Sequence, residues 1–134
     1  VHAGAVAIGL PSLARAAAER AERLRADLAD LGAVPGPAPA RSVAPASDGR
    51  AVGCLYVVEG STLGGRLIHR RLAGLLPGEE GRRYFAGGAD DVERWPVFCA
   101  ALEAFGAGGN RLPDIVLGAR QAFATFRDCL EADR

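Results

Sequence analysis

Residues 55–68 read LYVVEGSTLGGRLI, a helical stretch that contains three glycines within six residues, Gly60, Gly64 and Gly65. The flanks on both sides have the composition of a good helix. Each glycine in a helix interior costs on the order of 1 kcal/mol relative to alanine. Two interpretations stay open. A second helix packs closely across small residues, or the backbone bends to lie directly over a flat ligand. Spacing alone favours the packing interpretation.

Four helices follow from the periodicity of apolar residues. The first covers 12–31, and its charged side chains are interpreted as a solvated face, Arg20 and Asp27 among them. The second starts at Ser47 or Asp48, which are good N-caps, and runs to about Leu76. It is the helix that carries the three glycines.

The third helix starts with a capping box formed by Asp90 and Glu93 and ends near Gly106. The fourth starts between Asn110 and Pro113, with its proline in the first turn. Its predicted buried face consists of Ile115, Ala119, Ala122, Phe123, Phe126 and Leu130.

The remaining segments predict connectors. Four prolines within 33–46 favour an extended connector, and the glycines of 77–88 indicate a loop. No useful strand alternation is present. The sequence therefore predicts one all-α domain over residues 1–134.

Composition narrows the class of protein. The 134 residues carry 16 basic and 16 acidic side chains, which argues against nucleic acid as an obligate partner. No apolar run approaches the roughly 20 residues that cross a bilayer, so we expect no membrane span. The three cysteines, none in a CxxC motif, predict neither disulfides nor a zinc site and favour the cytoplasm.

Side chains suited to catalysis are scarce. His2 and His69 are the only histidines, and neither belongs to an ExxH or HExxH motif. A cofactor that brings its own chemistry would place fewer demands on the side chains.

The wider sequence resembles the bacterial heme oxygenase family, and most closely the branch that accompanies bacteriophytochromes. The resemblance runs through LYVVEGSTLGG, then Tyr84-Phe85-Ala-Gly87, Trp95-x-x-Phe98 and Ala122-Phe-Ala-Thr-Phe126. It covers roughly residues 12–130, and its first block is the most specific part. It implies a heme-oxygenase-like multihelical fold in which this block is the kinked distal helix.

The resemblance also implies an activity. Heme is both substrate and cofactor, and with O2 and an external electron donor or reductase it is cleaved to biliverdin, carbon monoxide and iron. A bacteriophytochrome is the implied acceptor of biliverdin. Ordered water held by backbone groups at a glycine kink would explain why few catalytic side chains are needed.

Site residues transfer only where the motif matches. Gly60, Gly64 and Gly65 match the distal glycines, and Ser61 stands where animal members have an aspartate that organises water. These four are the predicted catalytic positions, and the three glycines also contact heme.

Other expected ligand contacts are less specific. Arg66, with Arg70 and Arg71, either reaches the heme propionates or forms a solvated face, and the position matching the propionate-binding basic residue of animal members is Ala100. Trp95, Phe98, Phe123 and Phe126 are either core or heme-pocket wall, with packing favoured for each. Arg66 and Phe126 complete the predicted heme-binding set.

The family's proximal histidine has no clear counterpart. His2 is the only histidine upstream of residue 12, and His69 lies on the distal helix. We therefore expect either an N-terminally short heme oxygenase or a degenerate, non-catalytic domain that binds a tetrapyrrole or a protein partner. Without the first family helix an apolar groove would be exposed, and a second copy of the chain could cover it.

Overall fold

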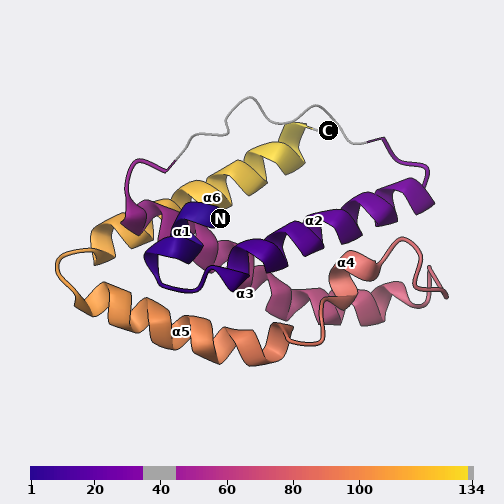
Figure 1. The fold of residues 1–134 in the computed structure, drawn as a ribbon. Helices are drawn as coiled ribbons and strands as arrows, with labels where there is room; N and C mark the ends of the chain where they lie inside the picture. Colours follow the sequence, from indigo (N-terminus) through magenta and orange to yellow (C-terminus); the bar gives the residue numbers. More distant parts are fainter. Residues whose placement is uncertain (35–44, 133–134) are drawn as a thin grey trace.

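The computed structural model describes residues 1–34 and 45–132, and all regular elements in these ranges are helices (Figure 1). This confirms the all-α prediction. The helices in chain order are α1 (His2–Ala7), α2 (Ser12–Asp30), α3 (Asp48–Leu72), α4 (Arg83–Ala86), α5 (Asp91–Ala107) and α6 (Leu112–Ala132). The longest, α3, contacts α1, α4, α5 and α6. It is therefore the centre of the fold.

The start of α3 is the predicted one. The Oγ of Ser47 accepts a hydrogen bond from the Arg50 backbone N–H at 3.2 Å and donates one to Asp114 Oδ2 at 2.7 Å. The same hydroxyl therefore caps α3 and ties it to α6. The helix ends at Leu72, one turn before the predicted end, and is continuous through its glycines. The predicted kink of its axis stays a prediction.

Glycines allow α3 to approach its neighbours closely. A Cβ atom at Gly53 would overlap backbone atoms of Ile115 on α6, and one at Gly118 would overlap the Arg50 backbone on α3. A Cβ atom at Gly4 of α1 would come within 2.5 Å of the Ala51 carbonyl oxygen. At these crossings the helices meet backbone to backbone.

The core is built largely from small and aliphatic side chains, as the composition predicts. A cluster of Ala5, Leu13, Leu55 and Phe98 is fully or almost fully buried, and Trp95 packs against it. The prediction that Phe98 is a core residue is confirmed.

The buried face of α2 carries two charged residues. The buried residues are Leu13, Ala16, Arg20 and Asp27. Leu24 and Leu31, two of the regularly spaced apolar residues of 12–31, are 41% and 53% exposed. The solvated-face interpretation is therefore wrong for Arg20 and Asp27, because each has a specific partner on another element.

Two local predictions in the segment before α5 are also wrong. The loop expected over 77–88 contains the short helix α4. Asp90 makes no side-chain capping bond, whereas the Asp91 carboxylate accepts a hydrogen bond from the N–H of Gly88, which precedes the helix, at 2.6 Å. The expected extended connector over 33–46 lies largely outside the described residues. Within the described ranges, no helix is long and apolar enough to cross a membrane.

The helix α6 is buried only along its first half. Ile115 is 8% exposed, but Phe123, Phe126 and Leu130 are 60%, 53% and 71% exposed. The prediction of one continuous buried face is therefore wrong beyond the crossing with α3.

The glycine contacts predict opposite effects for two alanine substitutions in α3. Gly53→Ala should lower the free energy of unfolding by about 1–3 kcal/mol, because the new methyl group meets the α6 backbone. Gly64→Ala, where a Cβ atom would have nothing within 4 Å, should raise that free energy by about 0.5–1 kcal/mol. Urea denaturation followed by circular dichroism measures both. Equal effects would contradict the backbone-contact assignment.

Candidate functional site

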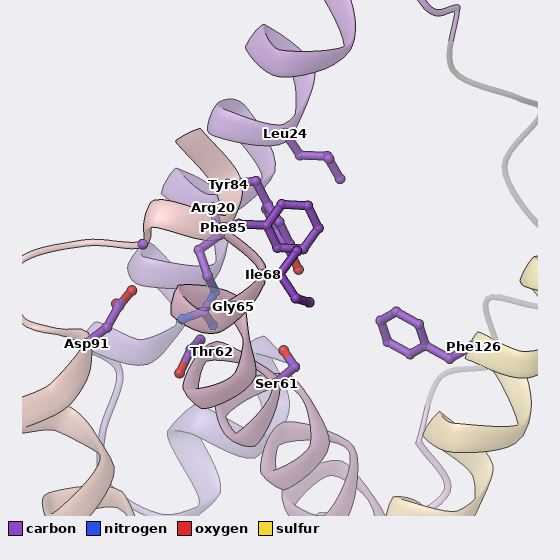
Figure 2. Close-up of a pocket in the computed structure, with 11 residues that line it drawn as sticks. Arg20, Leu24, Ser61, Thr62, Gly65, Ile68, Tyr84, Phe85, Asp91 and Phe126 are labelled. Carbon is purple, nitrogen blue, oxygen red and sulfur yellow. The ribbon is translucent and has the colours of Figure 1, made fainter. Parts of the chain in front are cut away.

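Two cavities lie along the C-terminal half of α3. The first, of about 380 Å³, is lined by residues of α2, α3, α4, α5 and α6 and by Gly87 between α4 and α5 (Figure 2). The second, of about 470 Å³, is lined by residues of α3, α5 and α6. Ser61 and Phe126 line both. We call the two cavities together the ligand groove, and each has a volume in the range of small-molecule sites.

Gly60 and Gly64 make no close contact with the backbone of another helix, and Gly64 lines neither cavity. Nothing within 4 Å faces a Cβ atom built at Gly64, and at Gly60 the nearest atoms belong to the Trp95 ring at 3.6 Å. The close-packing interpretation is therefore wrong for the pair Gly60 and Gly64. Gly65 does make a close approach, because a Cβ atom there would be 3.3 Å from the Phe85 carbonyl oxygen. Gly60 lines the second cavity and Gly65 the first.

Two hydroxyls of the glycine segment, residues 60–65, bond back to the helix. Ser61 Oγ donates to the Val58 carbonyl at 2.7 Å, and Thr62 Oγ1 donates to the Glu59 carbonyl at 2.6 Å. Each hydroxyl keeps lone pairs that can accept a hydrogen bond. Ser61 is exposed at the junction of the two cavities. It can therefore accept a bond from a water molecule or ligand in the groove.

A buried ion pair forms part of the wall of the first cavity. Arg20 Nη2 of α2 donates to Glu59 Oε1 of α3, and the two side chains are 6% and 5% exposed. Among the described residues, Arg20 Nη1 is buried without a hydrogen-bond partner. The apolar periodicity of 12–31 does not predict this pair. The available signal was that Arg20 lies seven residues from Leu13, two turns along the same face of α2.

The short helix α4 contributes Tyr84 and Phe85 to the wall of the first cavity. Its start is held by Asp27 of α2, whose carboxylate accepts bonds from the backbone N–H groups of Arg83 at 2.9 Å and Tyr84 at 2.7 Å. The Arg83 guanidinium pairs with Asp30, and this hydrogen bond raises the pKa of Arg83 above its ordinary value. Residues of α2 thus fix α4 in place.

The aromatic residues divide between core and groove. Phe98 is buried, whereas Trp95 is half-buried and lines the second cavity, with its ring centroid 5.9 Å from that of Tyr56. Phe123 and Phe126 are exposed and line the groove, so the packing expectation is wrong for these two. Figure 2 shows the Phe126 ring pointing from α6 toward the side of α3 that carries Ser61 and Ile68.

The expected basic residues and histidines lie elsewhere. Arg66 lines neither cavity, and its Nη2 donates to the Gly88 carbonyl at 3.4 Å. His2 is exposed on α1 and also lines neither cavity. His69 has both ring nitrogens engaged with Arg82, Nδ1 with its carbonyl at 3.2 Å and Nε2 with its Nη1 at 3.0 Å. In this arrangement His69 has no free nitrogen for a metal.

The expectations about metal sites and disulfides can be compared with the described part of the chain. Cys54, Cys99 and Cys129 are free thiols. The residues at 1–34 and 45–132 contain no cluster of three or more histidine, cysteine or acidic side chains that could hold a metal ion. The groove is instead suited to a largely apolar ligand.

Curated proteins similar to this chain are heme oxygenases. One from Xanthomonas campestris pv. campestris is 38% identical over 120 residues, which cover 85% of this chain and 68% of the relative. Heme oxygenase PigA of Pseudomonas aeruginosa is 38% identical over 127 residues, 90% of this chain and 62% of the relative. No protein-family profile and no solved structure gives a significant match.

The contacts of Asp27 predict that it stabilises the fold more than an exposed acidic residue of the same helix. Asp27→Ala should lower the free energy of unfolding by about 2 kcal/mol, because two backbone N–H groups lose their acceptor. Glu22→Ala removes only an exposed pair with Arg25 and should cost less than about 1 kcal/mol. Urea denaturation compares them. Similar losses for both variants would show that Asp27 does not hold α4.

Proposed function

The chain belongs to the heme oxygenase family, and we propose that it binds heme in the ligand groove and supports its oxidative cleavage to biliverdin, carbon monoxide and iron. The observation that carries this proposal is the open surface of the glycine segment. Three glycines weaken the helix, and for Gly64 no other part of the described chain explains the absence of a side chain. A flat ligand in contact with the backbone would explain it.

The lining of the groove suits a porphyrin in polarity. Leu24, Ile68, Tyr84, Phe85 and Phe126 give the first cavity a largely apolar lining, and Tyr56, Trp95 and Phe123 do the same for the second. Burial against such walls favours a large aromatic ligand. Arg20 provides one cationic group at the wall, and its unpartnered Nη1 is a donor in need of an acceptor.

Bound heme would supply the iron chemistry that activates dioxygen, and would itself be the molecule oxidised. The chain's own contribution is to hold and orient. Gly60 and Gly64 let the backbone approach one face of the ligand, while Phe123 and Phe126 cover apolar surface and exclude water. Ser61 offers lone pairs at the junction of the cavities, and an ordered water there could donate a hydrogen bond to them. An external reductant is required, and we propose a bacteriophytochrome as the acceptor of biliverdin.

A second candidate function is non-catalytic binding of a tetrapyrrole in the same groove. The positions of the two histidines favour it, because His2 lies outside the groove and both nitrogens of His69 are engaged with Arg82. Neutral imidazole is a common ligand for heme iron. Added free imidazole can therefore substitute for a ligand that neither histidine is placed to provide.

A hemin titration, with and without imidazole, tests binding at the glycine segment. Gly64→Leu should weaken hemin binding at least about tenfold, or about 1.4 kcal/mol, because its side chain occupies the space over the backbone. Gly74→Leu is the matched control, since a Cβ atom there also has nothing within 4 Å but Gly74 lies beyond the end of α3 and outside the glycine segment. Absorption spectroscopy measures the affinities. Equal hemin affinity for the parent protein and Gly64→Leu would place heme elsewhere, and absence of binding would refute the proposal.

Turnover distinguishes the two candidate functions. The hemin complex with imidazole, supplied with ascorbate and oxygen, should yield biliverdin that liquid chromatography identifies. The complex without imidazole should yield little. Specific hemin binding with no biliverdin under either condition would favour the non-catalytic function. Efficient turnover without imidazole that His2→Ala abolishes would show that His2 ligates the iron.

A further inference from the structure

We propose that Arg20 is a positioning residue of the ligand groove, which holds the glycine segment in place through its buried ion pair with Glu59. This inference rests on the proposed function, because the segment it positions is the one expected to face heme. Arg20 belongs to α2, and Glu59 immediately precedes Gly60 on α3.

The burial of this pair calls for an explanation other than stability. Both side chains are at least nine-tenths buried, and removing two charges from water costs several kcal/mol per ion, which their attraction does not reliably recover. Well-packed apolar residues at such positions are often as stabilising. Apolar contacts are not directional, whereas a hydrogen-bonded ion pair is. The ion pair therefore restricts how the two helices lie relative to each other.

The position of the glycine segment depends on contacts at its two ends. A Cβ atom at Gly64 would have nothing within 4 Å, and one at Gly60 would meet only the Trp95 ring, so neither position is held by a side chain of its own. At the N-terminal end of the segment, Glu59 is bonded to Arg20. At its C-terminal end, Gly65 approaches the Phe85 carbonyl oxygen of α4.

Residues on one face of α2 hold the partners in both contacts. Arg20 holds Glu59 directly, and Asp27, two turns later on the same face, holds the start of α4 and thereby Phe85. Figure 2 shows the Arg20 side chain reaching across from α2 to α3 near Gly65 and Thr62. The helix α2 therefore sets the position of the glycine backbone relative to the groove without contributing a reacting group.

The test removes the ion pair without leaving a buried charge alone. In Arg20→Met with Glu59→Leu, the pair is replaced by apolar side chains, so the protein should fold with an unchanged or higher melting temperature. The matched control is Arg25→Met with Glu22→Leu, which removes an exposed pair three residues apart on the same helix. Ligand-free protein is followed by amide hydrogen exchange, and hemin binding is followed by absorption spectroscopy.

We expect the buried-pair variant to exchange amides at 60–68 about tenfold faster than the parent, with exchange at 49–56 unchanged, because only the tethered segment opens more often. Its hemin affinity should fall about tenfold. The control variant should match the parent in both measurements. Arg20→Lys, which keeps the positive charge beside Glu59, should lie closer to the parent than Arg20→Met.

Two results would overturn the inference. Equal exchange at 60–68 in variant and parent would show that the pair does not tether the segment, and so would faster exchange of both regions alike. Faster exchange at 60–68 with unaltered hemin affinity would show that the tether does not position the ligand site. If the parent binds no hemin, the proposed function fails, and hydrogen exchange still decides whether Arg20 tethers the segment.

Discussion

The close approach of α3 to α6 and α1 is the constraint on which the rest of the structure depends. Gly53 and Gly118 bring the backbones of α3 and α6 together, and Gly4 does the same for α1. Backbones this close leave no room for side chains between them, so the first half of α3 is enclosed and Val52 and Leu55 are fully buried. Beyond the crossing, Phe123 and Phe126 of α6 are exposed and line the groove beside the second half of α3. The groove is thus a consequence of where the glycine crossing lies.

Polar residues inside the fold organise what this crossing leaves open. On α2 the residues at intervals of seven, Leu13, Arg20 and Asp27, are all buried, but only the first belongs to the apolar core. Arg20 reaches Glu59 and Asp27 reaches the backbone of α4, so the later turns of this helix interact through directional bonds. Such bonds contribute modestly to net stability but restrict geometry strongly. Two walls of the first cavity, α3 and α4, are positioned in this way.

Features that depend on local sequence patterns could be predicted from the sequence. The Ser47 cap and the four long helices follow from capping chemistry and apolar periodicity, and the structure confirms them to within a few residues. The partners of Arg20 and Asp27 could not be predicted from local patterns, because they lie 39 residues away at Glu59 and 57 residues away at Tyr84. The helix α4 was missed for the same reason. Four residues have no periodicity, and the acceptor that starts this helix belongs to α2.

The glycines of α3 show why the candidate site was only partly visible in the sequence. Gly53 and Gly64 are alike in a sequence, since both are helix-interior glycines that cost about 1 kcal/mol relative to alanine. Only the structure separates them, because a side chain at position 53 would collide with α6 and one at position 64 would meet open space. The cost at Gly53 is explained within the chain by helix packing. The cost at Gly64 has no such explanation in the described residues, although its neighbours Leu63 and Gly65 line the two cavities. Under the proposed function, a ligand in backbone contact would be the physical reason for that glycine.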